Sequence, residues 1–171
     1  MLLRNFYKYS AIQTMFGETY PIKVTNTSGQ EKETYASYYG YNIGNSMQKT
    51  TLNTSHSDWG IIIGSNTTPP TFDDYKLYSI LTTFSSTVSN IKSVSDDGVV
   101  TFTSNITVVN TTANEITIGE IGLMVDTNPN ASGNGSLRIL VERTVLDTPI
   151  TLQPNEVGQI TYTISYQMKT E

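Results

Sequence analysis

The residues able to carry out acid–base or metal chemistry are few, and they stand in turn-like segments. The single histidine, His56, lies close to Ser55 and Asp58, which are the residue types of a nucleophilic relay. Neighbouring residues of an extended chain point to opposite faces, so these three cannot form that relay among themselves. We therefore expect a solvated loop histidine. Without cysteine, zinc would depend on His56 and carboxylates, which is a poor ligand set for that metal.

One segment resembles the start of a calcium-binding loop. Asp126 is followed by Thr-Asn-Pro-Asn, so that oxygen-bearing side chains occupy alternate positions. The sixth position, which requires glycine, is Ala131, and the twelfth position, which requires glutamate, is Leu137. We therefore expect a hairpin loop here and no metal site.

The paired carboxylates also lack the setting of a catalytic pair. Asp73-Asp74 and Asp96-Asp97 are of the kind found in turns. A glycosidase needs two carboxylates facing each other across one cleft, and nothing in the sequence places two of them in that way. The sequence thus predicts no catalytic residues, no metal and no cofactor, and the chain is not expected to be an enzyme.

A group of tyrosines has a clearer use. Tyr35, Tyr39 and Tyr41 fall on one face of a predicted strand over residues 34–43, with a bend near Gly40. Tyrosine buries its ring while its hydroxyl stays wet, which suits interfaces and sugar platforms. This face is predicted to be a half-buried sheet surface, a subunit contact, or a glycan platform that also uses Trp59.

Residues 2–16 are predicted to form an amphipathic helix that stops at Gly17, because glycine readily takes the left-handed conformation after a helix. The apolar stripe has three- and four-residue steps: Leu2, Phe6, Tyr9, Ile12 and Phe16. The stripe either caps an open edge of the chain's own β-domain or docks onto a neighbouring subunit. Together with Tyr35, Tyr39 and Tyr41, it forms the candidate assembly interface.

The rest of the chain has the period-two pattern of β-strands separated by turns. Strands are expected near 20–24, 34–43, 59–63, 77–94, 100–108, 116–125, 137–141, 150–152 and 160–168. The apolar run 59–63 suits a strand buried on both faces, and the strand within 77–94 is ambiguous, with Leu77, Ile80, Leu81 and Phe84 as its buried members. We predict an all-β antiparallel β-sandwich, jelly-roll or immunoglobulin-like, with a short N-terminal α-helix. Residues 1–17 would form the arm and residues 18–171 a single domain.

A break in the alternation predicts a β-bulge. Apolar residues occupy even positions up to Ile118 and odd positions from Ile121 onward, which implies one extra residue beside Glu120. We predict that Glu120 orients a loop or pairs with Arg138 or Arg143 across a strand.

Composition excludes several classes of partner. Only 15% of the 171 residues are charged, the net charge is −5, and the ten basic residues are scattered, so a phosphate-binding face is not expected. No segment approaches the ~18 consecutive apolar residues of a membrane span. The first residues mix charged with apolar positions, unlike a secretory signal, so the Asn-X-Ser/Thr triplets are expected to stay unmodified.

Three stretches, read in order, resemble small structural proteins of bacteriophage particles, the head and tail accessory subunits of gut-phage type. They are Ile62–Thr71 followed by Asp74-Tyr75 and Leu77, then Ile106–Thr112 followed by Ile116–Leu123, and finally Arg143–Leu146 followed by Pro149–Glu156 and the strand Ile160–Tyr166. The opening Met1–Lys8 is similar to the start of such proteins. The resemblance covers most of the chain from about residue 60 and transfers no catalytic residue.

The resemblance implies a virion subunit, in a capsid, head-fibre, neck or tail position, assembled in the bacterial host cytoplasm. Its partners would be other virion proteins and further copies of itself, with neither nucleic acid nor membrane among them. A carbohydrate-binding or adhesin module that recognises a host surface glycan is the alternative.

Overall fold

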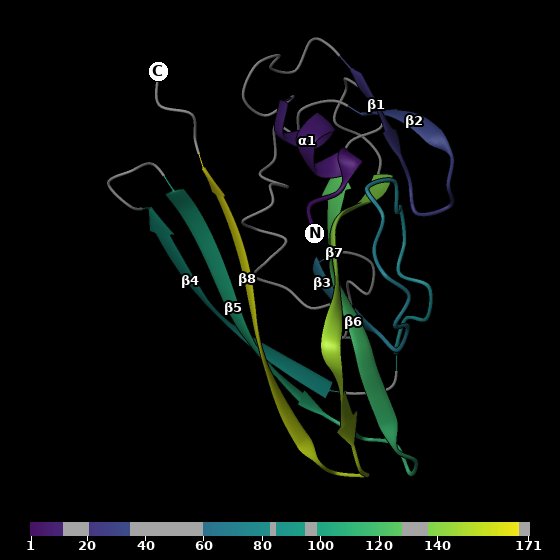
Figure 1. Cartoon of the computed structure of the whole chain (residues 1–171), viewed down its shortest axis with the longest axis vertical. Helices are drawn as coiled ribbons and strands as arrows, with labels where there is room; N and C mark the ends of the chain where they lie inside the picture. Colours follow the sequence, from purple (N-terminus) through teal and green to yellow (C-terminus); the bar gives the residue numbers. More distant parts are fainter. Residues whose placement is uncertain (12–20, 35–59, 83–84, 95–98, 128–136, 168–171) are drawn as a thin grey trace.

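The computed structural model describes residues 1–11, 21–34, 60–82, 85–94, 99–127 and 137–167 (Figure 1). This part of the chain is mostly β. Its elements are α1 (Arg4–Ala11), β1 (Ile22–Thr25), β2 (Glu31–Thr34), β3 (Gly60–Gly64), β4 (Ser85–Val94), β5 (Val99–Val109), β6 (Ile116–Thr127), β7 (Leu137–Leu152) and β8 (Val157–Gln167).

The strands form several antiparallel sheets. The orders are β3-β6-β7 and β4-β5-β8 for the two larger sheets, and β1 pairs with β2. The long strands of the two larger sheets converge at the lower end of Figure 1 and spread apart toward α1. At the converging end, residues 110–115 connect β5 to β6 and residues 153–156 connect β7 to β8, so both segments pass between these sheets.

Asn110 joins the two crossings. Its side chain is fully buried, and Nδ2 donates to the carbonyl oxygens of Leu152 (2.9 Å) and Asn114 (2.8 Å). The Asn155 N–H donates to the Asn110 carbonyl oxygen (2.8 Å), and Asn155 has a φ of 64°, which asparagine tolerates. Backbone groups that the sheets leave unpaired at this corner are satisfied in this way.

One apolar cluster takes side chains from both larger sheets. Ile106 and Val108 of β5 and Ile160 and Ile164 of β8 pack with residues of β3, β6 and β7. Burial of each aliphatic side chain contributes roughly 1.5–3 kcal/mol, so this shared core is the main favourable term that we can assign. The expected alternation along β5 and β8 is confirmed, and β3 is buried at every position, as its continuous apolar run predicts.

The predicted break in the ladder beside Glu120 is confirmed, but the extra residues lie in β7 and not in β6. The pairing of β6 with β7 shifts register between Ile118 and Glu120, where residues 146–149 of β7 stand opposite Gly119 alone, and again between Leu123 and Met124. The sequence predicts separate strands at 137–141 and 150–152, which is wrong, because β7 is one strand of 16 residues. Its polar middle interrupts the apolar alternation, yet the register shifts allow the ladder to continue past it.

Two further boundaries differ from the predictions. The helix begins at Arg4, because Leu2 and Leu3 are extended beside β7, where the Leu3 N–H donates to the Val141 carbonyl oxygen (3.0 Å). The ambiguous strand begins only at Ser85, after a loop. Of its four predicted buried members, Leu77 is buried, Leu81 half-buried and Ile80 46% exposed, while Phe84 lies outside the described residues.

Candidate interaction surface

The structure places the described part of the predicted helical stripe inside its own chain. Phe6 and Tyr9 are 5% and 0% exposed and belong to the shared core, and Leu2 packs partly buried against it. In this fold Phe6 and Tyr9 therefore have no surface to offer a neighbouring subunit. The predicted site residues Ile12, Phe16, Tyr35, Tyr39 and Tyr41 lie outside the described residues, as do His56 and Trp59.

A buried asparagine fixes which face of α1 points inward. Asn5 is 3% exposed, and its Oδ1 accepts from the Thr25 N–H (3.0 Å). Its Nδ2 donates to the carbonyl oxygens of Thr25 (2.7 Å) and Leu140 (3.1 Å). Because these bonds tie the helix to β1 and β7, the opposite side of α1 is left on the surface.

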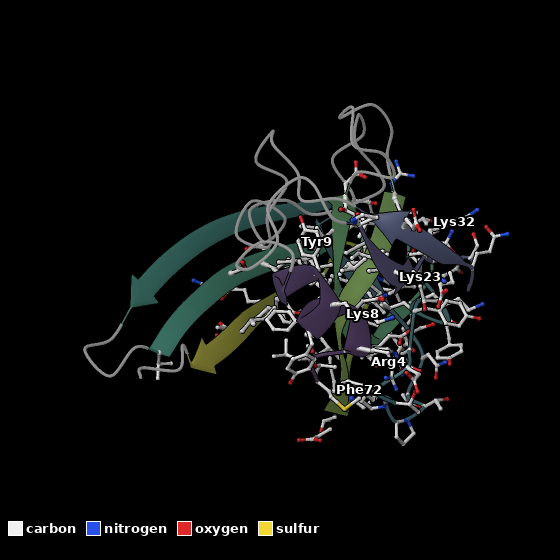
Figure 2. The ribbon with its side chains drawn as sticks, turned by 90° about the horizontal axis from the view of Figure 1, so that it is seen from above. Arg4, Lys8, Tyr9, Lys23, Lys32 and Phe72 are labelled. Atoms are coloured by element: carbon white, nitrogen blue, oxygen red, sulfur yellow. The ribbon has the colours of Figure 1, made fainter. Side chains whose placement is uncertain are left out.

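That opposite side carries an aromatic pair. Tyr7 and Phe72 are 55% and 42% exposed, and their ring centroids are 5.9 Å apart. The Arg4 guanidinium lies 4.7 Å from the Phe72 ring centroid, and its Nε contacts Asp73 at 2.5 Å. Figure 2 shows Arg4 and Phe72 together on one side of the helix, with Tyr9 on the other side.

A third exposed aromatic side chain, Tyr78, stands on the same loop as Phe72. It is 52% exposed, and the Lys76 ammonium lies 5.9 Å from its ring centroid. We call the contacting pair Tyr7 and Phe72 the aromatic surface, and Tyr78 is a separate exposed ring on the loop of Phe72. Sequence periodicity gives little sign of the pair, because Phe72 belongs to a loop and Tyr7 stands outside the apolar stripe.

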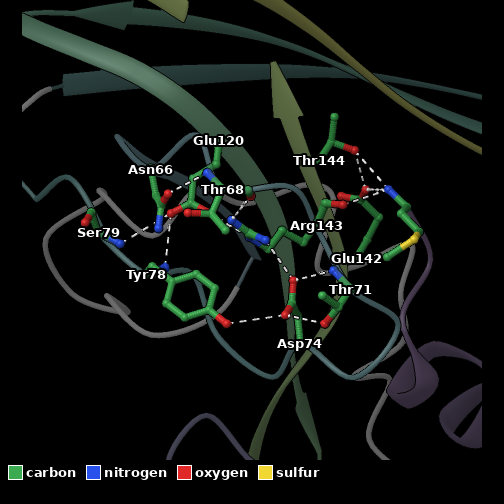
Figure 3. Close-up of polar contacts among 11 residues, drawn as sticks. Asn66, Thr68, Thr71, Asp74, Tyr78, Ser79, Glu120, Glu142, Arg143 and Thr144 are labelled. Atoms are coloured by element: carbon green, nitrogen blue, oxygen red, sulfur yellow. Dashed lines mark hydrogen bonds and ion pairs between the residues drawn. The ribbon is translucent and has the colours of Figure 1, made fainter. Parts of the chain in front are cut away.

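The loop that carries Phe72 and Tyr78 is anchored by a buried ion cluster around Arg143 (Figure 3). Arg143 and Glu120 are both fully buried, and the Arg143 Nε donates to Glu120 Oε2 at 2.7 Å. Nη1 donates to Asp74 Oδ2 (2.7 Å) and Nη2 to the Thr68 carbonyl oxygen (2.9 Å). The guanidinium also lies 5.0 Å from the Tyr78 ring centroid.

The two carboxylates bind the loop backbone in turn. Glu120 Oε1 accepts from the N–H groups of Tyr78 (3.1 Å) and Ser79 (3.3 Å). Asp74 accepts from both the N–H (2.9 Å) and the hydroxyl (2.7 Å) of Thr71. The prediction for Glu120 is confirmed in both of its forms, since Glu120 pairs with Arg143 and also orients a loop. The second carboxylate, Asp74, was missed, because its turn-like setting gives no sign of a partner.

The pKa shifts show which charges the cluster stabilises. Burial lowers the pKa of the Arg143 guanidinium, but the hydrogen bonds and charges of Glu120 and Asp74 outweigh burial and raise it. Burial raises the pKa of Asp74, but hydrogen bonds from Thr71 and Arg143 outweigh it and hold the pKa below its usual value. Arg143 and Asp74 therefore remain ionised at neutral pH, and the bonds from Nε, Nη1 and Nη2 position the loop.

A second buried group links the two larger sheets. The Tyr162 hydroxyl of β8 donates to Glu142 Oε2 of β7, and Glu142 Oε1 accepts from the Thr144 hydroxyl at 2.5 Å. The Met1 amine lies 2.6 Å from the same Oε1 atom. Burial, followed by the charge and hydrogen bond of Glu142, raises the pKa of Tyr162 well above its usual value. The adjacent charges of Glu142 and Arg143 within an apolar strand are the signal that could have indicated both buried groups.

Within the described ranges, no three His, Cys, Asp or Glu side chains are grouped to hold a metal ion. No helix in the same ranges is long and apolar enough to span a membrane. Comparisons with protein-family models, curated proteins and solved structures gave no match for this chain.

Proposed function

We propose that this chain is a structural subunit of a bacteriophage particle and works through contacts with other virion proteins. The observation that carries the proposal is the aromatic surface, whose loop is held by the buried ion cluster around Arg143. A capsid-decoration, head-fibre, neck or tail position is compatible with a subunit of this kind.

The physical argument begins with the aromatic side chains. Tyrosine and other aromatic residues are enriched at protein interfaces because they bury large areas while losing few rotamers. Tyr7 and Phe72 expose half or nearly half of their surface, although the chain is large enough to bury such rings. Binding costs less free energy when the loop is already ordered, and the contacts of Glu120 and Asp74 provide that order.

The sequence resemblance supports the same proposal. Its three stretches contain Asp74, Glu120 and Arg143 respectively, and these three residues form the ion cluster. At the converging end of the sheets, Asn110 of the second stretch bonds Leu152 of the third. The motifs that resemble virion subunits therefore correspond to one physical unit. We further propose that the two larger sheets form a sandwich, since one apolar cluster takes side chains from both.

The test is to look for the chain in particles. Phage particles from a host that carries this gene would be purified through a density gradient and a high-salt wash, and their proteins measured by quantitative mass spectrometry. We expect a fixed number of copies per particle, and fewer copies of a Tyr7→Ala/Phe72→Ala variant. Thr148→Ala, at an exposed site on β7, is the matched control and should leave the copy number unchanged. Absence of the chain from washed particles would refute the proposal.

The second candidate function is glycan binding. Tyr7 and Phe72 form a paired exposed ring surface with the charged groups of Arg4 and Asp73 beside it, and rings with adjacent hydrogen-bonding groups suit sugars. A glycan array probed with the wild type and with Phe72→Ala distinguishes the two functions. Binding of a defined sugar that disappears in the variant would favour this candidate.

A further inference from the structure

The free strand edges of the described chain are mostly covered or carry residues that discourage pairing. Residues 79–81 hydrogen-bond along β3, and residues 1–3 do so along the first half of β7. Beyond that cover, β7 contains Asp147 and Pro149. The other edge strands also contain charged residues. These are Lys23 in β1, Glu31, Lys32 and Glu33 in β2, and Lys92 in β4. Charges, proline and covering segments are the usual means by which proteins prevent strands from pairing edge to edge.

Among the described residues, the strand β8 has none of these features. Among the described strands it pairs with β5 alone, and it forms the margin of its sheet in both Figures 1 and 2. Its 11 residues, VGQITYTISYQ, include neither a charged residue nor proline. A long neutral edge presents a row of backbone donors and acceptors to which another strand can add.

The sequence of β8 also points to a particular partner. Ile-Thr-Tyr-Thr-Ile, residues 160–164, reads the same in both directions around Tyr162. When an antiparallel copy of β8 is placed with Tyr162 opposite itself, Thr161 faces Thr163 and Ile160 faces Ile164. Like residues then meet in every row from 160 to 164, and no row along the whole strand brings charges together, so the centre of the edge is complementary to itself about a two-fold axis.

The outer face of the sheet would continue across such a contact. Hydroxyl pairs already join β5 to β8, with Thr103 and Thr163 Oγ1 atoms 3.2 Å apart and Thr101 Oγ1 3.0 Å from Ser165 Oγ. Cross-strand threonine pairs of this kind stabilise sheets. A second β8 would extend these rows with Thr161 beside the partner's Thr163.

We infer that β8 is a self-association edge, at which two copies of this chain pair antiparallel around Tyr162 to form one continuous six-stranded sheet. The inference rests on the proposed function as its biological setting, because it names one contact that a repeated particle subunit would make. The physical claim concerns the isolated chain and can be tested without a particle.

The register offers a matched pair of variants at the exposed positions 161 and 163. Thr161→Glu/Thr163→Lys places opposite charges across the two-fold axis, whereas Thr161→Glu/Thr163→Glu places like charges there. Sedimentation equilibrium over a range of concentrations would measure association. We expect the wild type and the Glu/Lys variant to dimerise, and the Glu/Glu variant to dimerise at least about tenfold more weakly than the Glu/Lys variant. Far-ultraviolet circular dichroism would show that the variants fold.

Several results would overturn the inference. A wild type that remains monomeric up to its solubility limit would do so, as would equal dimerisation of the two variants. If the Glu/Glu variant does not fold, amide exchange of the wild type decides, since protection of β8 must rise with concentration. If the chain dimerises through β8 but is absent from washed particles, the virion function is refuted and the self-association edge is not. If the isolated chain is monomeric but is present in particles, the self-association edge is refuted and the virion function is not.

Discussion

Replacing Arg143 with methionine tests the buried ion cluster most directly. The substitution keeps a long side chain in the space but removes three hydrogen bonds, two of them to carboxylates. Glu120 and Asp74 would then be left at 0% and 7% exposure without a cation. Removing one partner of a buried pair costs about 3–5 kcal/mol, whereas domains of this kind are stable by about 5–15 kcal/mol. We therefore expect Arg143→Met to lose a large part of its free energy of unfolding at pH 7.

The dependence on pH follows from Asp74. In the wild type the pKa of Asp74 is lowered by folding, so its contribution is present above the ordinary carboxyl pKa of about 3.9 and is lost as pH falls through the folded value. In Arg143→Met the cation that favours the ionised form is absent, and protonation relieves the unpaired charge. The difference in stability between wild type and variant should therefore narrow below about pH 4.

Urea unfolding followed by circular dichroism at several pH values measures these differences. A triple variant with Asp74→Asn and Glu120→Gln added to Arg143→Met should recover most of the loss, because the cluster then holds no unpaired buried charge. Arg4→Met, which removes an exposed ion pair with Asp73, is the control and should change stability little. A loss below about 1 kcal/mol for Arg143→Met, or no recovery in the triple variant, would refute the reasoning.

Three further predictions concern other buried groups. The raised pKa of Tyr162 means that its contribution to the free energy of unfolding is complete below about pH 10 and is lost as pH rises further. In Tyr162→Phe the free energy of unfolding should therefore fall less steeply above pH 10, by up to about 1.4 kcal/mol per pH unit. Asn110→Ala should lower the free energy of unfolding in urea by about 1–3 kcal/mol, because the carbonyl groups that it bonds lose their donor. Asn114→Ala keeps the backbone carbonyl that accepts this bond, so its loss of stability should be smaller. Gly64→Ala should lower the free energy of unfolding by about 1–3 kcal/mol, because the added Cβ would lie 2.8 Å from a backbone oxygen. Thermal unfolding should show a smaller loss of stability for Gly158→Ala, where the added Cβ meets only a leucine side chain at 3.1 Å.

The sequence by itself determined the features that depend on local periodicity. The alternation along β5 and β8, the buried run of β3 and a break in the strand pairing beside Glu120 could all be predicted. Each follows from a pattern within a few neighbouring residues, because side chains of a strand alternate between two faces. The same local view failed for β7, where the paired charges at 142 and 143 look like an interruption although both are buried.

Only the tertiary structure decided which residues meet. The sequence left Arg138 and Arg143 as equal partners for Glu120 and gave no reason to connect Asp74, which is 69 residues from Arg143. That contact requires the register of β6 with β7 and the return of the loop after β3, and neither is encoded in a local pattern. The helix likewise showed an apolar stripe that either its own domain or a neighbour could cover. The bonds of Asn5 to β1 and β7 turn that stripe inward and leave Tyr7 on the surface, because buried polar groups must find partners wherever the fold supplies them.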